Sequence, residues 1–205
     1  MPQDVKWLFF DVGSTLVDEQ AVYESIFKEL AEKAGKTYSE IYETALGYYK
    51  QNKKGDLETG RLLGIKPGKW PIAYEKLYPD AAECLKTLSS RYKIGIIANQ
   101  PHGIKDRLKN YGILPYIDLV ISSAEEGVSK PDPRIFQIAL KRSSCLPQHA
   151  MMIGDRIDND ILPAKTIGMH TAWVRQGFGQ YWKLTSEDEK ADLSAASLTE
   201  LCSML

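Results

Sequence analysis

Cysteine is scarce in this chain of 205 residues, which contains only three. Cys84, Cys145 and Cys202 are odd in number, lie far apart in the sequence and form no CxxC pair. The sequence therefore indicates neither a disulfide framework nor a zinc site. We expect reduced thiols, as in a cytoplasmic protein.

The sequence also lacks any long apolar run. No stretch approaches the roughly 18 consecutive apolar residues of a membrane-spanning helix. Near the N-terminus, Asp4, Lys6 and Asp11 interrupt the segment in which the apolar part of a signal peptide would lie. We therefore predict a cytoplasmic location and no membrane partner.

An excess of charge of either sign is missing as well. The chain has 26 Lys and Arg residues against 27 Asp and Glu residues, and its formal net charge is −1. No run of basic residues forms the stripe that binding to a phosphate backbone requires. This composition argues against a nucleic-acid partner and leaves a small molecule as the expected one.

What the sequence does contain is an alternation of short apolar runs with helical patterns. The apolar runs, rich in β-branched and aromatic residues, predict strands at 5–10, 93–98, 117–123, 150–154 and 170–174. Between the later runs, apolar residues recur at helical spacing in 80–91, 103–110, 133–142 and 159–167. Such alternation favours a parallel sheet with helices on both faces. The predicted fold class is α/β, with a Rossmann-like sheet.

The interval 17–78 breaks this alternation and contains no convincing strand pattern. Apolar residues recur at helical spacing over 20–34, and Thr37 with Glu40 forms a capping-box signature that predicts the start of a second helix. A shorter third helix is expected at 57–64. We therefore predict a small α-helical cap, residues 17–78, inserted into a core made of residues 1–16 and 79–205.

Acidic residues stand where two of the predicted strands end. Asp11 follows the first strand, and Asp155 and Asp160 follow the strand at 150–154. In an open parallel sheet, ligands bind at the carboxyl ends of the strands. A hard divalent cation together with Lys130 would balance the three carboxylates, so that a phosphate could approach Asp11 without repulsion.

These segments resemble the motifs of the haloacid dehalogenase-like (HAD) hydrolase superfamily, in particular of members with a helical cap inserted after the first motif. The resemblance covers nearly the whole chain. Its motifs, in the expected order, are DVGSTL (11–16), IIANQ (96–100), SKPDPRIF (129–136) and IGDRIDNDILPAKTIGM (153–169). It implies a Mg²⁺-dependent hydrolase of the phosphatase type that acts on a small phosphorylated metabolite.

The resemblance also implies a role for each matching residue. Asp11 would be the nucleophile that forms an aspartyl intermediate, and Lys130 would bridge Asp11 and the phosphate. Asp155 and Asp160 would hold Mg²⁺ together with Asp11 and with the backbone carbonyl of Gly13.

Two positions depart from the phosphatase pattern. Gly13 stands where a second aspartate would protonate the leaving group and later activate water, and Ala98 stands where a Ser or Thr would donate to the phosphate. We expect the backbone amide of Asn99, its side chain or a water to supply the phosphate contact instead. Because general acid–base catalysis contributes about 10²–10⁴ in rate, we expect slow turnover and accumulation of the covalent intermediate. His102 is a candidate substitute acid, although a lone loop histidine is more often solvated.

Two other functions stay open at this point. The fold could bind phosphate or a metabolite in a regulatory role without turnover, or Asp11 could act in C–Cl or C–P cleavage, which needs no acid for the leaving group. Aromatic residues at helical spacing are usually packing residues, and this reading is favoured for Tyr38, Tyr42, Tyr48 and Tyr49. The basic cluster of the insert could face an anionic substrate or only solvent, and it consists of Lys50, Lys53 and Lys54.

Overall fold

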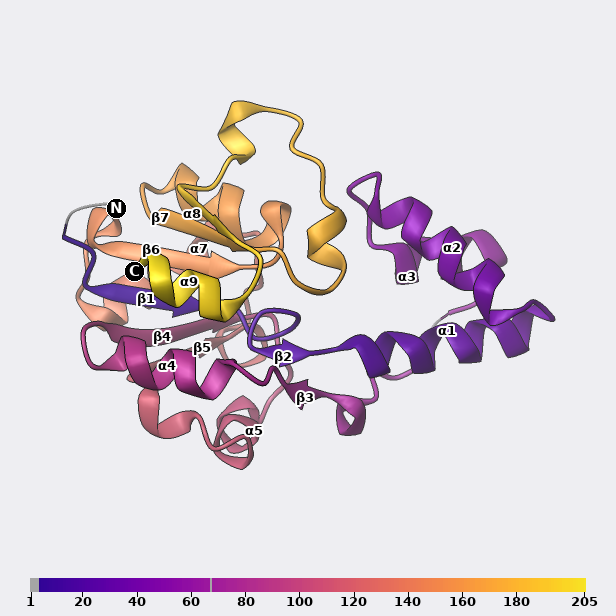
Figure 1. The fold of residues 1–205 in the computed structure, drawn as a ribbon, viewed down its shortest axis with the longest axis horizontal. Coiled ribbons are helices and arrows are strands. Elements are labelled where there is room, and N and C mark those ends of the chain that lie inside the picture. Colours follow the sequence, from indigo (N-terminus) through magenta and orange to yellow (C-terminus); the bar gives the residue numbers. More distant parts are fainter. Residues whose placement is uncertain (1–3, 67) are drawn as a thin grey trace.

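A parallel six-stranded sheet forms the centre of the molecule, in a computed structural model that describes residues 4–66 and 68–205 (Figure 1). Its strand order is β5-β4-β1-β6-β7-β8. In chain order the strands are β1 (Trp7–Phe10), β4 (Lys93–Ala98), β5 (Leu119–Ser122), β6 (Ala150–Gly154), β7 (His170–Val174) and β8 (Leu193–Ala195). Residues 1–3 of the predicted core and residue 67 of the predicted cap lie outside the described residues.

Both faces of the sheet are buried, because successive side chains of a strand point to opposite faces. In β1, Leu8 and Phe10 belong to one apolar cluster and Phe9 belongs to another, and all three side chains are fully buried. The first cluster includes residues of α4 (Ala81–Ser89), α5 (Ile104–Asn110) and α9 (Leu198–Met204). The second includes residues of α7 (Pro133–Ser143) and α8 (Leu162–Thr166). The predicted α/β fold with helices on both faces is therefore confirmed.

Four features of the core were not expected. The edge strand β8 and the helix α9 were not predicted. In β8 no alternation of apolar residues is visible, because the strand has three residues, of which only Ala195 is buried. The helix expected at 159–167 begins instead as a π-helical turn, Ile157–Ile161, and continues into α8. A short helix, α6 (Ser123–Glu126), follows β5 directly.

The three helices expected in the insert are present. They are α1 (Gln20–Ala34), α2 (Tyr38–Tyr49) and α3 (Gly55–Leu63), and they share an apolar cluster of their own that includes Phe27, Leu30 and Ile41. The capping box forms as expected, since Thr37 N donates to Glu40 Oε2 at 2.8 Å and Glu40 N donates to Thr37 Oγ1 at 3.3 Å. That the insert is a domain separate from the core stays a prediction.

The expectation that 17–78 contains no strand is wrong at its two ends. Val17–Asp18 (β2) and Lys76–Leu77 (β3) pair as a short antiparallel ribbon. Two-residue strands leave no periodic pattern, and they exist only because the chain leaves and re-enters the core at the same place. Figure 1 shows this ribbon between the sheet and the helices of the insert.

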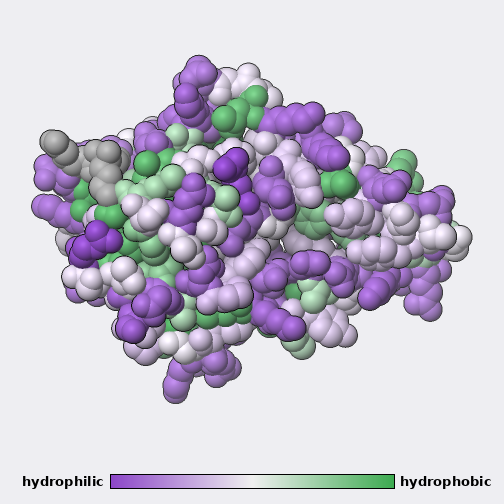
Figure 2. All heavy atoms as spheres, viewed as in Figure 1, coloured by the Kyte–Doolittle hydropathy of each residue, from purple (hydrophilic) through white to green (hydrophobic). Residues whose placement is uncertain are grey.

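The outer surface is mostly hydrophilic on the face drawn in Figure 2, with a hollow between the sheet-containing part and the inserted helices. No helix within residues 4–66 and 68–205 is both long enough and apolar enough to cross a membrane.

The strand order brings three loops to one edge of the sheet. The chain runs from β1 outward through β4 and β5, and then returns to the other side of β1 through β6. Ligands of such sheets bind where the order reverses, at the carboxyl ends of the strands. Asp11, Asn99 and Asp155 each follow a strand directly at this edge.

The close packing of β4 against β1 can be tested with an alanine at Gly95. A Cβ there would overlap the ring of Phe9 on the neighbouring strand, so Gly95→Ala should lower the free energy of unfolding by about 1–3 kcal/mol. Gly47→Ala is the matched control, because Gly47 lies inside α2 with no atom within 4 Å of its Cβ position, and it should stabilise by up to about 1 kcal/mol. Urea unfolding measures the free energy of unfolding of both variants. If Gly95→Ala were as stable as the wild type, this packing of β4 against β1 would be contradicted.

Candidate active site

A buried lysine joins two carboxylates at the carboxyl edge of the sheet. Lys130 Nζ lies 2.7 Å from Asp11 Oδ1 and 2.6 Å from Asp160 Oδ1. Lys130 is 4% exposed and Asp160 is fully buried. Asp155, also buried, brings a third carboxylate, and one oxygen from each of the three acids lies within 4.8 Å of the others. Four residues that were predicted as site residues therefore meet in one cluster.

The strands and the π-helical turn hold these acids in place. Asp11 N donates to Ile153 O at 2.9 Å, which ties the end of β1 to β6. The carboxylate of Asp160 accepts from Arg156 N at 3.1 Å and lies directly against Gly154, where any Cβ would overlap it. Glycine at 154 thus lets Asp160, from the turn after β6, reach the strand end where Asp155 follows.

Asn99 holds the backbone of Lys130 from both sides. Its Oδ1 accepts from Lys130 N at 2.7 Å, and its Nδ2 donates to Lys130 O at 2.8 Å. The peptide bond that follows, to Pro131, is cis. Because the amide side chain of Asn99 is used on Lys130, only its backbone is free for the phosphate contact expected from the sequence. The phosphate-binding role of Asn99 stays a prediction, and positioning Lys130 is what its side chain does here.

The cluster carries more negative charge than it can balance, since one ammonium faces three carboxylates. Burial and the neighbouring acids raise the pKa of Asp155 well above its ordinary value. Burial also raises the pKa of Asp160 to about 6, although Lys130 opposes the shift. For Lys130 burial lowers the pKa, but the charges of Asp11 and Asp160 outweigh it and the net shift is upward.

This donor set fits Mg²⁺. The ligands available are carboxylate oxygens, which hard divalent cations prefer, and they converge on one point from two adjacent loops. A divalent cation would also remove the excess negative charge that raises the carboxyl pKa values. The backbone carbonyl of Gly13 as a further ligand stays a prediction.

A carboxylate that the sequence did not reveal fills the space above Gly13. Glu19 is 8% exposed, and its Oε2 accepts from Ser14 Oγ at 2.8 Å. A Cβ built on Gly13 would lie 2.5 Å from Glu19 Oε1, so an aspartate at position 13 would collide with it. Burial, together with the charges of Asp11 and Glu75, raises the pKa of Glu19 to about 8 despite the bond from Ser14.

Sequence reasoning missed Glu19 because nothing in its spacing marks it. It occupies the N-cap position of α1 but makes no side-chain capping bond, since the side chain turns back toward the loop after β1. The one available signal was indirect: Gly13 leaves room for a carboxylate that approaches from elsewhere in the chain.

The cluster opens into a cavity of about 540 Å³ between the core and the inserted helices. Of the predicted site residues, those that line it are Asp11, Gly13, Asn99, Lys130 and Asp155. Lys53 and Lys54 of the basic cluster line it from the cap side, whereas His102 is exposed and does not belong to its lining as described. Glu19 lines the same cavity and is the acid nearest to Gly13 in space.

The chain is similar to known proteins over most of its length. A family model described as haloacid dehalogenase-like hydrolase matches residues 5–168. A glyceraldehyde 3-phosphate phosphatase of Methanocaldococcus jannaschii is 30% identical over 93% of the chain and 82% of that protein. A phosphoserine phosphatase of Thermus thermophilus is 28% identical over 87% of the chain and 63% of that protein. The crystal structure of a HAD phosphatase from Thermococcus onnurineus superposes with a TM-score of 0.66 at 26% identity and covers 98% of this chain and 97% of its own.

The raised pKa of Glu19 predicts a pH-dependent stability difference. Because the folded protein binds this proton more tightly than the unfolded chain, the contribution of Glu19 to stability falls as pH rises from about 4.5 to about 8. Glu19→Gln does not titrate, so its free energy of unfolding relative to wild type should rise by at least about 1 kcal/mol between pH 6 and pH 9. Urea unfolding in EDTA measures this difference.

The control for that experiment is Glu83→Gln, on the exposed side of α4, which should show the same difference from wild type at both pH values. A flat profile for Glu19→Gln as well would contradict a neutral, buried Glu19 in the folded protein.

Proposed function

The chain belongs to the haloacid dehalogenase-like hydrolases, and on that premise we propose that it hydrolyses a phosphate ester of a small metabolite through a covalent intermediate on Asp11. It is a hydrolase of the phosphatase type. The observation that carries the proposal is the pair formed by Asp11 and Lys130, 2.7 Å apart at the base of the cavity. A buried ammonium beside a cavity-facing carboxylate favours approach of an anion to that carboxylate.

In the first step, a carboxylate oxygen of Asp11 attacks phosphorus, and the bond from phosphorus to the ester oxygen breaks. The ester oxygen leaves with the bonding electrons and takes up a proton. In the second step, water attacks the phosphoryl group on Asp11, and the carboxylate is released together with phosphate. Lys130 holds Asp11 and offers positive charge to the phosphoryl oxygens in both steps. Mg²⁺, when bound by the acidic cluster, would supply further positive charge to those oxygens.

We assign the missing proton carrier to Glu19, on the basis of its position. Its carboxyl group occupies the volume that a side chain at position 13 would take, and it lines the same cavity as Asp11. The carboxyl group of Glu19 would give its proton to the leaving oxygen and then take one from the attacking water. This assignment revises the expectation that the covalent intermediate accumulates, because that expectation depended on the absence of any general base.

The substrate is proposed only at the level of its class. Two relatives are named for different substrates, glyceraldehyde 3-phosphate and phosphoserine, and both compounds are small phosphate monoesters. A cavity of about 540 Å³ has room for a molecule of that size. A cytoplasmic location and the absence of nucleic-acid partners remain predictions from the sequence.

One observation favours C–P cleavage as a second candidate. Lys54 lines the catalytic cavity from the cap, and partial burial together with the charge of Arg156 lowers its pKa, which increases the fraction of nucleophilic amine. Such an amine can condense with a carbonyl of a 2-oxoalkyl phosphonate and release water. The resulting iminium would accept the electrons of the breaking C–P bond while Asp11 takes the phosphoryl group.

Asp11→Asn tests the nucleophile. With Mg²⁺ present, the wild type should release nitrophenol from para-nitrophenyl phosphate, and Asp11→Asn should lose at least about 100-fold in kcat because an amide is a poor nucleophile. EDTA should abolish the wild-type activity. Asp118→Asn is the control and should retain the wild-type activity. Asp118 lies just before β5, at the end of the strands opposite to the acidic cluster.

Activity that survives in Asp11→Asn would overturn the proposed nucleophile. The second candidate would replace the leading proposal if the wild type cleaved a 2-oxoalkyl phosphonate but no phosphate ester, and if Lys54→Arg lost that cleavage. Binding of phosphate without turnover of either compound would leave the fold as a binding protein.

Dependence on the leaving group tests Glu19. Glu19→Gln should lose about 10²–10⁴ in kcat with an alkyl phosphate, whose leaving group needs a proton, and much less with para-nitrophenyl phosphate. Gly13→Asp alone should not improve the wild type, because the new side chain would collide with Glu19. Gly13→Asp combined with Glu19→Ala should recover activity toward the alkyl ester. If Glu19→Gln lowered kcat by the same factor with both esters, the assignment of Glu19 as the proton carrier would be contradicted.

A further inference from the structure

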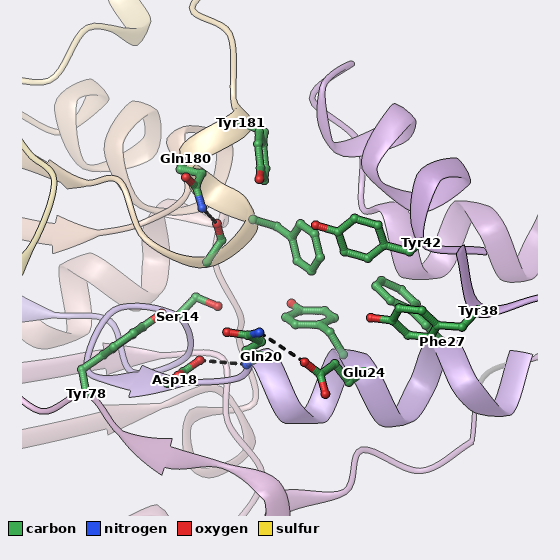
Figure 3. A pocket seen from close by; sticks show the side chains of 13 residues that line it. Ser14, Asp18, Gln20, Glu24, Phe27, Tyr38, Tyr42, Tyr78, Gln180 and Tyr181 are labelled. Atoms are coloured by element: carbon green, nitrogen blue, oxygen red, sulfur yellow. Dashed lines mark hydrogen bonds between the residues drawn. The ribbon is translucent and has the colours of Figure 1, made fainter. Parts of the chain in front are cut away.

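A second cavity of about 290 Å³ lies next to the catalytic one, between the inserted helices and the 3-10 turn Gly177–Tyr181 that follows β7 (Figure 3). The two cavities have Ser14, Tyr23 and Phe178 in common, so these side chains stand between them. None of the residues proposed above for catalysis lines this second cavity in the described part of the chain. The proposed hydrolysis therefore gives it no function.

Aromatic rings from three elements surround the second cavity. They are Tyr23 and Phe27 of α1, Tyr38 and Tyr42 of α2, and Phe178 and Tyr181 of the 3-10 turn. Tyr38 and Tyr42 are stacked with centroids 6.0 Å apart, and Tyr42 meets Phe27 edge-on at 6.1 Å. Figure 3 shows these rings on both sides of the space, with Tyr181 above it and Tyr38 toward the end of α1. The packing role that the sequence favoured for Tyr38 and Tyr42 is therefore incomplete.

The charged side chains that line this cavity are all acidic. Asp18 and Glu24 contribute carboxylates, and the described lining includes no Lys, Arg or His. Their recorded hydrogen bonds come from one neutral residue: Gln20 N donates to Asp18 at 2.8 Å, and Gln20 Nε2 donates to Glu24 at 3.2 Å. Among the described residues, no ion pair joins either carboxylate to a basic side chain.

The charges of these carboxylates also act on two neighbouring phenols. Partial burial and the charge of Glu24 raise the pKa of Tyr38. Burial and the charge of Asp18 raise the pKa of Tyr78, another lining residue. Outside this lining, Lys50 Nζ lies 5.9 Å from the centroid of Tyr181, so this ring can receive a cation on a face.

We propose that the second cavity binds a small organic ammonium ion, held by the faces of Tyr42 and Tyr181 and by the carboxylate of Glu24. Aromatic faces attract cations through their quadrupole, and the attraction increases where water is excluded. An anion would be repelled by both carboxylates. The bound ion would contact α1, α2 and the turn after β7, and so would join the inserted helices to the core.

A pair of probes of nearly equal shape tests the proposal. Choline carries a quaternary ammonium, and 3,3-dimethylbutan-1-ol replaces that nitrogen with neutral carbon. By titration calorimetry on the full chain, choline should bind with saturation and about tenfold more tightly than the alcohol. Glu24→Gln and Tyr42→Leu should each weaken choline binding by about fivefold or more.

Two controls separate this site from the catalytic one. Glu43→Gln, on the exposed side of α2, should bind choline like the wild type. Asp11→Asn should also bind it normally, so that the proposal stands or falls independently of the hydrolysis. Equal binding of the alcohol would show an apolar cavity without selection for charge and would overturn the proposal. So would the absence of saturable choline binding, or loss of that binding in Asp11→Asn.

Discussion

The contact of one buried ammonium with two carboxylates is the interaction on which the rest of the site depends. Lys130 comes from the loop after β5, Asp11 from the end of β1 and Asp160 from the turn after β6, so the contact joins three loops at one edge of the sheet. A lysine this deeply buried is stable in its charged form only with partners. Asn99 fixes its backbone and Gly154 gives Asp160 room, which explains why small or amide side chains stand at these strand ends.

Burial raises the pKa values of Asp155 and Asp160 in this cluster and of Glu19 beside it. The carboxylates beside Lys130 need a cation. Glu19, buried and beside acidic neighbours, keeps its proton more easily than an exposed carboxyl group does, although the hydrogen bond from Ser14 opposes this shift. One small region can thus hold acids in two protonation states, as the chemistry of phosphate esters requires. The carboxyl group of Glu19 fits at this place because residue 13 is glycine and has no side chain.

The inserted segment contributes to the walls of both cavities. Tyr23 of α1 packs edge-on against Phe178 of the turn after β7 with centroids 4.9 Å apart, and this pair separates the two cavities. The loop between α2 and α3 contributes Lys53 and Lys54 to the cavity that Asp11 lines. Any change in the position of the cap relative to the core would therefore alter both cavities together, because they share one wall.

The sequence by itself determined the fold class, five of the six strands of the sheet, the three inserted helices and the acids at the ends of β1 and β6. Periodicity and local motifs are properties of neighbouring residues, so they can be read without a structure. Only the tertiary structure decided that Glu19 fills the space over Gly13, that the side chain of Asn99 bonds the backbone of Lys130, and that β2 pairs with β3. These contacts join residues whose spacing in the chain carries no signal, and they form only when the two ends of the insert and the loops of the sheet meet at one edge.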